Sequence, residues 1–114
     1  MTWEELRAYC LSLPGAQETF PFEPGAAVFK AANGKMFGVS VTTAEPLDIS
    51  VKCDPDIAAA LRAEYAAIVE GYHNKRHWIT ITLNSDVTDD RVRQLVRDSY
   101  DLVAPRARAT RRPG

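Results

Sequence analysis

The residues best suited to chemistry lie in one stretch, residues 71–78, which reads Gly-Tyr-His-Asn-Lys-Arg-His-Trp. It holds two cations, an amide, two aromatic rings and both histidines of the chain. A strand-like run, residues 79–83, follows directly and would hold these groups on a rigid base, as is common for binding loops. Cations that contact phosphates, beside an aromatic ring that stacks on bases, are typical of nucleic-acid-binding surfaces. The stretch therefore predicts a binding site for a polyanion or a planar ligand.

The rest of the candidate site follows from the alternation of side chains along strands. If Ile79 and Ile81 face the core, Trp78 and its neighbours of the same parity face the open side of the sheet. The candidate nucleic-acid-binding residues are Lys30, Lys35, Lys52, His73, Asn74, Lys75, Arg76 and Trp78. An alternative is that the segment 14–26 covers Trp78 with Phe20 and Phe22. In that case Arg76 and Lys52 would pair with Asp48, Glu18 or Glu23.

Other chemistries have weaker support in the sequence. His73 and His77 have the spacing of a helical zinc pair, but a third ligand is missing. Cys53 precedes a helix start, yet no histidine is near in sequence and Asp54 disfavours a thiolate. The chain has no glycine-rich phosphate loop, nucleophile elbow or metalloprotease helix. We therefore expect no metal, no cofactor and no catalytic residue, and hence a protein that is not an enzyme.

The length and net charge of the chain limit the number of domains and the kind of binding site that we can expect. The 114 residues, 46% hydrophobic and 25% charged, indicate one globular domain, residues 1–105. Four arginines lie in the polar segment 106–114, which we expect to be a disordered tail. Removing them from the net charge of −1 leaves −5 for residues 1–105. An acidic body supports nucleic-acid binding only through a local basic patch.

Two features bear on the compartment. No apolar run approaches the roughly 20 residues of a membrane span, and the N-terminal residues do not resemble a signal peptide. The sequence therefore predicts a cytoplasmic protein with no membrane contact. Cys10 and Cys53 lie in apolar-periodic elements, which favours buried free thiols over a disulfide.

Hydrophobic periodicity divides the chain into elements. Thr2 and Glu5 form a capping box for a first helix, which ends at residues 14–15. Asp54 and Pro55 start a second helix, and a third begins at residues 88–90. Strand-like alternation occupies residues 27–31, 35–42, 47–52 and 79–83.

The order is therefore α-β-β-β-α-β-α, with room for a further short strand before Asn74. It predicts a two-layer α+β domain, an antiparallel sheet with the helices on one face. The expected core face of the sheet consists of Phe29, Phe37, Val39, Ile49, Val51, Ile79 and Ile81. The expected buried stripes of the last two helices are Ile57, Leu61, Tyr65 and Ile68, and Val92, Leu95, Val96, Ser99, Leu102 and Val103.

The Asn-Gly turn at residues 33–34 admits two registers. A two-residue loop would pair Lys30 with Phe37 and place a lysine on the core face. A three-residue loop, 32–34, with a glycine bulge pairs Phe29 with Phe37 and sends Lys30 to the open face. Because a slip of one residue inverts every side chain, the hydrophobic pattern favours the three-residue loop.

The chain up to about Val103 resembles the MmcQ/YjbR family of small bacterial proteins. The matching pieces are Pro14-Gly15-Ala16, Glu18, Phe20-Pro21-Phe22, Val28-Phe29-Lys30, Gly34-Lys35-Met36-Phe37, Lys52-Cys53-Asp54-Pro55, Gly71-Tyr72-His73, Asn74-Lys75-Arg76-His77-Trp78, Thr80 and Ser99-Tyr100. One departure is that His73 directly precedes Asn74, which shortens the loop. The resemblance implies a fold similar to type III secretion chaperones. It also implies DNA binding by a double wing, here the hairpin at 33–34 and the loop 73–76.

The sequence is compatible with three functions. The leading one is DNA binding by the candidate residues. The second is a protein-interaction or chaperone-like module that uses an exposed sheet face. The third is binding of a small anionic ligand, with an unrecognised enzyme in the same class. We expect a monomer or weak dimer in each case.

Overall fold

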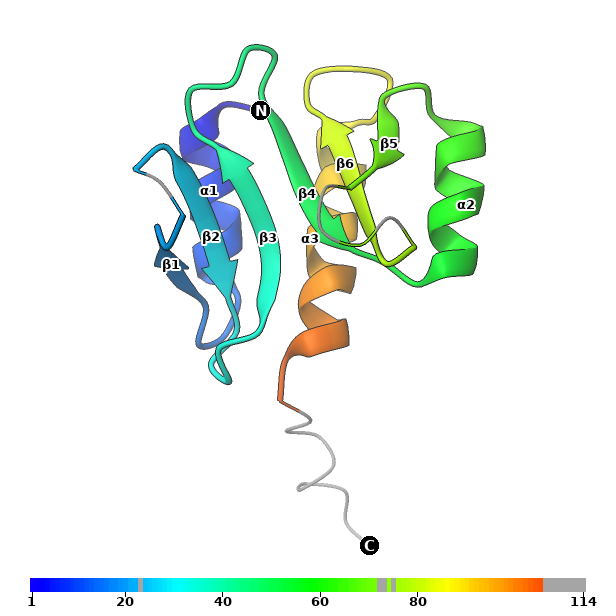
Figure 1. Ribbon diagram of the computed structural model, residues 1–114. Helices are drawn as coiled ribbons and strands as arrows, with labels where there is room; N and C mark the ends of the chain where they lie inside the picture. The colour runs from blue at the N-terminus through cyan, green and yellow to red at the C-terminus, as the bar shows by residue number, and fades with distance from the viewer. Residues whose placement is uncertain (23, 72–73, 75, 106–114) are drawn as a thin grey trace, which may run out of the picture.

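The computed structural model describes residues 1–22, 24–71, 74 and 76–105, and within them the chain forms three helices and six strands (Figure 1). The elements are α1 (Trp3–Ser12), β1 (Gln17–Thr19), β2 (Ala26–Lys30), β3 (Met36–Val41), β4 (Asp48–Lys52), α2 (Pro55–Glu64), β5 (Ile68–Glu70), β6 (Trp78–Thr82) and α3 (Asp89–Val103). All strand pairs are antiparallel, in the order β1-β2-β3-β4-β6-β5. Helices α1 and α3 lie behind the sheet in Figure 1, and α2 stands beside β5.

The predicted α+β class is confirmed, with two short strands added to the predicted order. β5 is the short strand for which the sequence left room before Asn74. β1 is the second added strand and lies between α1 and β2. It has three residues and lies at the sheet edge, immediately before Phe20 and Pro21, where a strand can end without loss of inner ladder bonds.

The helix starts are as predicted. The Thr2 side chain accepts a hydrogen bond from the Glu5 amide (3.1 Å), and the Glu5 carboxylate accepts one from the Thr2 amide (2.7 Å). Asp54 caps α2 by accepting from the amide of Asp56 (3.0 Å), with Pro55 in the first turn. These bonds satisfy amide donors that have no partner inside the helix.

The β2–β3 hairpin has the predicted three-residue loop but not the predicted register. The Ala31 amide donates to the Lys35 carbonyl (2.9 Å), and Gly34 has a positive φ of 83°. Beyond the loop, Lys30 pairs with Met36 as the expected register requires, but Phe29 pairs with Gly38, so Phe37 is an extra residue in β3. The expected pairing of Phe29 with Phe37 is therefore wrong. This second bulge is not signalled by a turn motif.

The bulge changes which residues of β3 face the helices. Phe37 remains fully buried in the core, as expected. Gly38 also faces the core, since a Cβ there would contact Ile49 and Phe29. The parity of β3 is inverted from this point, so Val39 lies on the face opposite the helices and its expected place in the core is wrong.

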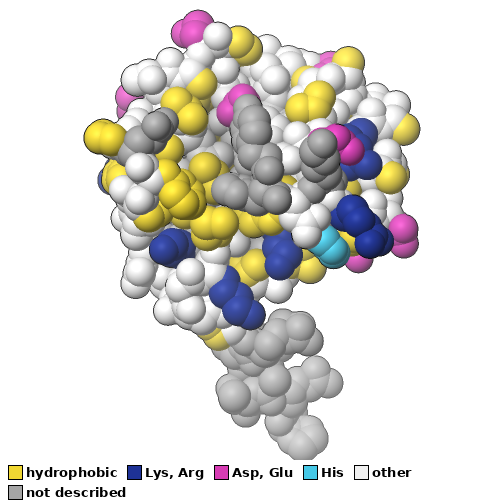
Figure 2. Space-filling model, in the orientation of Figure 1, with side chains coloured by type: hydrophobic (Ala, Val, Ile, Leu, Met, Phe, Trp, Pro, Cys, Tyr) yellow, Lys and Arg dark blue, Asp and Glu magenta, His cyan; other side chains and the backbone are white. Residues whose placement is uncertain are grey.

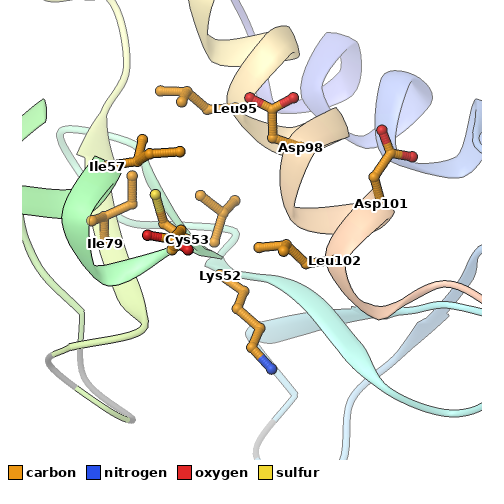
Figure 3. A pocket seen from close by; sticks show the side chains of 10 residues that line it. Lys52, Cys53, Ile57, Ile79, Leu95, Asp98, Asp101 and Leu102 are labelled. Atoms are coloured by element: carbon orange, nitrogen blue, oxygen red, sulfur yellow. The ribbon is translucent and has the colours of Figure 1, made fainter.

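Two expected core residues of the helices are exposed instead. Ile57 of α2 is 54% exposed and Leu102 of α3 is 53% exposed. Ala58 and Leu61 supply the buried side of α2, and Tyr100 joins the buried side of α3. The physical reason is position, because Ile57 and Leu102 border a hollow between α2 and α3 rather than the sheet (Figure 3).

A serine of α3 holds β3 and β4 together beside the bulge. Gly38 pairs with Val51, so Phe37 and Lys52 would be the next ladder partners. Instead, the fully buried Ser99 hydroxyl donates to the Phe37 carbonyl (2.7 Å) and accepts from the Lys52 amide (2.8 Å). Both backbone groups are satisfied through a side chain, as buried polar groups must be.

The C-terminal half of α3 fixes the neighbouring loops as well. The Tyr100 hydroxyl donates to the Pro14 carbonyl, and its ring meets the ring of Phe37 edge to face at 5.3 Å. The Asn33 side chain donates to the Val103 carbonyl (2.8 Å), which is one of the carbonyls left free at a helix end. The hairpin tip is thus anchored to the end of α3.

We predict that Ser99→Ala will destabilise the fold by about 1–3 kcal/mol, because it leaves two buried backbone groups without a partner. Urea denaturation measures the change in unfolding free energy. The matched control is Ser12→Ala. Ser12 is an exposed residue of α1, so this change should alter the stability by less than about 0.5 kcal/mol. A Ser99→Ala variant as stable as this control would contradict the bridging role.

Candidate nucleic-acid interface

Four cations gather at one end of the sheet, on or beside the face that the helices do not cover. The pairs Lys30–Met36 and Lys52–Trp78 lie on the same face in neighbouring strands. Lys35 precedes β3 at the hairpin tip, and Arg76 lies in the turn before β6. Figure 2 shows this face, with Lys and Arg side chains along one border of an apolar band. We call Lys30, Lys35, Lys52 and Arg76 the basic row.

Among the residues that the structure describes, no carboxylate neutralises the charges of the basic row. Within the described residues, none of the four lies within 4.0 Å of a carboxylate oxygen. The other cations differ, since Arg7 pairs with Glu18 at 2.8 Å and two arginines of α3 pair within their helix. The alternative in which Glu18 or Asp48 pairs with Lys52 or Arg76 is therefore not observed. The basic row remains available for phosphates.

Trp78, the expected stacking platform, is only 7% exposed. Ser50 and Thr80 follow on the same face of β4 and β6 and are buried too, with their hydroxyl oxygens 2.7 Å apart. Val28 on β2 is also fully buried. The centre of this face is thus more covered than the alternating pattern predicts. The indole is part of that packed layer, and it does not offer a free ring face to a base.

Asn74 organises the turn that leads into β6. Its side-chain oxygen accepts from the Arg76 amide (3.0 Å), which is an Asx turn. Its carbonyl accepts from the amides of His77 (3.0 Å) and Trp78 (2.9 Å). The side-chain oxygen of this candidate binding residue is therefore already hydrogen-bonded to the backbone. The exposed side chain keeps its NH₂ group as the available donor.

Two further candidate residues, His73 and Lys75, lie outside the described residues, as does Glu23. The first expected wing, the hairpin at 33–34, is described and anchored to α3 by Asn33. The second, the loop 73–76, is described only at Asn74 and Arg76.

The turn also depends on a close approach between Gly71 and Trp78. The Gly71 amide donates to the Trp78 carbonyl (2.9 Å). A Cβ at position 71 would lie 2.6 Å from the Trp78 Cβ and 2.9 Å from its carbonyl carbon. A glycine is therefore required here by space rather than by φ. The sequence shows the glycine but not this reason for it.

Neither thiol belongs to the basic row, and both are poorly suited to nucleophilic chemistry. Burial raises the pKa of the Cys10 thiol to about 12. The pKa of Cys53 is raised as well, first by burial and then by the carboxylates of Asp54 and Asp98. Both cysteines are free and buried, in agreement with the sequence prediction.

Two further properties of the described residues bear on function. No group of three or more His, Cys, Asp or Glu side chains there could hold a metal ion. In the same residues, no helix is long and apolar enough to cross a membrane.

The sequence matches the YjbR family model over residues 11–102. It is 34% identical to an uncharacterized protein of Escherichia coli O157:H7, YbdF, over 97% of this chain and 94% of that protein. It is 31% identical to the uncharacterized protein YjbR of Escherichia coli K12, over 88% of this chain and 85% of that protein. The chain therefore belongs to the YjbR family.

Solved structures have the same fold. The crystal structure of the Deinococcus radiodurans protein DR2400, with the family-model domain DUF419, is 39% identical with a TM-score of 0.83. The alignment covers 90% of this chain and 78% of that one. A crystal structure of a Pseudomonas syringae protein is 26% identical with a TM-score of 0.78, over 90% of this chain and 98% of the other.

We predict that Gly71→Ala will destabilise the protein by about 1–3 kcal/mol, the usual cost of overpacking a filled site. Thermal or urea unfolding measures it. Gly25→Ala is the matched control, because a Cβ at position 25 meets no atom of the described structure within 4 Å. If both variants unfold alike, the contact between Gly71 and Trp78 is not a constraint on the turn.

Proposed function

We propose that this YjbR-family protein binds DNA through the basic row, with the phosphate backbone as the main contact. The observation that carries the proposal is the lack of carboxylate partners around Lys30, Lys35, Lys52 and Arg76 among the described residues. Phosphate oxygens are the natural partners of such cations, and contacts to them supply most of the affinity in non-specific DNA binding.

The distribution of charge along α3 supports this location. Asp89 and Asp90 lie in the first turn of α3, and the N-terminal amine of Met1 is 3.3 Å from the Asp89 carboxylate. The other end of α3 is bonded to Asn33 at the hairpin tip. Because a 15-residue helix is about 22 Å long, these carboxylates are well separated from the basic row. The carboxylates of α3 nearer to the basic row are Asp98, bonded to Gln94, and Asp101, paired with Arg97. With this distribution an acidic body can keep a positive patch on the uncovered sheet face.

The burial of Trp78 determines the expected mode of binding. A base can stack only on an accessible ring face, and the indole is 7% exposed. Contacts to phosphates carry no sequence information directly. We therefore expect binding with little dependence on DNA sequence and strong dependence on salt.

A second candidate function, a protein-interaction module, rests on a different observation. Phe20, Phe22, Val41 and Val69 are exposed apolar side chains, and the apolar band in Figure 2 lies beside the basic row. Exposed apolar patches commonly mark interaction sites. Co-purification of a stoichiometric partner that is lost on Phe22→Ser would favour this function.

The DNA proposal predicts a specific dependence on salt. If the four cations of the basic row each contact a phosphate, log K should fall with log[salt] with a slope of about −4. Replacing Lys52 or Arg76 by Gln should flatten the slope by about one unit each. Fluorescence anisotropy with a labelled duplex, at several salt concentrations, measures both quantities.

Two controls keep this test specific. Arg93→Gln removes a charge that is already paired with Asp90 on α3, and it should leave the slope unchanged. The chain should also be tested with its end at Pro105, because four arginines in segment 106–114 could bind DNA on their own. The proposal fails if the shortened chain does not bind at low salt, or if the Lys52 and Arg76 variants bind like the original chain.

A further inference from the structure

A cavity of about 350 Å³ lies between α2 and α3, over the ends of β4 and β6. Val51 and Ile79 line its floor, and Leu95 lines its α3 side. In Figure 3, Ile57, Cys53 and Leu95 point toward a common hollow. The volume falls within the range of small-molecule sites, which are mostly apolar with a few polar groups.

The walls of this cavity contain apolar side chains that the fold itself does not bury. Ile57 of α2 and Leu102 of α3 both line it, and each is more than half exposed. Both belong to the apolar stripes of their helices, and most of the other stripe residues are buried. An apolar group placed between them would cover surface that is now in contact with water.

The charge at the rim selects the ligand class. Three carboxylates, those of Asp54, Asp98 and Asp101, belong to the cavity lining against one lysine, Lys52. In Figure 3 the Lys52 amine and the Asp101 carboxylate both extend away from the hollow between Ile57 and Cys53. One oxygen of Asp98 accepts from Gln94 (2.8 Å), and one oxygen of Asp101 lies 3.4 Å from Arg97. Each carboxylate thus keeps a second oxygen for another donor.

The buried thiol beside the cavity responds to the same carboxylates. Asp54 and Asp98 add to the effect of burial in raising the pKa of Cys53, while Arg62 and a backbone hydrogen bond with Asp54 act in the opposite direction. An anion placed here would meet the same repulsion as a thiolate. A cation would be stabilised.

We propose that this cavity binds a small organic cation, whose apolar body packs between Ile57 and Leu102 and whose ammonium group lies at the rim beside Asp98, with Asp101 one turn further along α3. This site shares only Lys52 with the basic row, and the Lys52 side chain points away from the cavity (Figure 3). It takes a ligand of opposite charge. It therefore does not depend on the DNA proposal.

Three probes that share one apolar body test the proposal on the full chain. We would titrate 4-phenylbutylamine, 4-phenylbutanol and 4-phenylbutanoate while recording amide NMR spectra. The amine should shift the amides of Cys53, Ile57, Asp98 and Leu102, and it should bind about tenfold more tightly than the acid. Equal binding of all three probes, or shifts centred elsewhere, would overturn the proposal.

Variants on the exposed rim test the assigned contacts. Asp98→Asn with Asp101→Asn should weaken amine binding about tenfold and leave the binding of the alcohol unchanged. Leu102→Ser should weaken both probes. Asp86→Asn and Val69→Ser, exposed residues outside the cavity lining, are the controls and should change neither. Unchanged amine binding in the double variant would contradict the proposal. If a variant fails to fold, the affinities of the amine, the alcohol and the acid for the unmodified chain still test it.

Discussion

The Ser99 hydroxyl replaces the hydrogen bond that Phe37 and Lys52 would otherwise make directly between β3 and β4. This replacement allows β3 to carry an extra residue without leaving a buried carbonyl and amide unpaired. With the bulge in place, Phe37 packs against Tyr100 in the core while Met36 and Lys30 stay on the opposite face. The side chains of β3 beyond Phe37 thus have their inverted parity at the point where one buried serine of α3 bonds to the strand.

The same end of the sheet is held at other points by α3. Asn33 ties the hairpin tip to the Val103 carbonyl, and Tyr100 ties the segment after α1 to the helix. Cations on such a base are presented on rigid elements, which reduces the entropy lost when they bind phosphates. The cavity between α2 and α3 has the opposite character, with apolar walls and carboxylates. The basic row lies on the uncovered face of the sheet and the cavity on the side of the helices, so the two proposed sites differ in both position and charge.

The sequence predicted the parts of the fold that local chemistry determines. Capping residues at Thr2 and Asp54, the three-residue loop before Lys35 and the buried cysteines all follow from short-range rules, and the structure confirms them. The bulge at Phe37 could not be predicted, because the hydroxyl that bonds to the bulged residue is 62 residues away in the chain. The predicted core position of Val39 was wrong because of the same bulge.

The candidate site was predictable to a similar extent. Alternation along the strands placed Lys30 and Lys52 on the correct face, since their parity does not depend on the bulge. It could not show that Trp78 is covered, because burial depends on what packs over a face as well as on its parity. A partial signal was present at Val28, which lies in a continuous apolar run that is typical of a strand buried on both faces. The most direct test of the account maps a short DNA duplex onto the chain ending at Pro105 by amide chemical shifts at low salt. We predict that the largest shifts occur at Lys30, Lys35, Lys52 and Arg76, with little change at Arg93 on α3. An absence of shifts, or shifts centred on α1 or α3, would contradict the proposed interface.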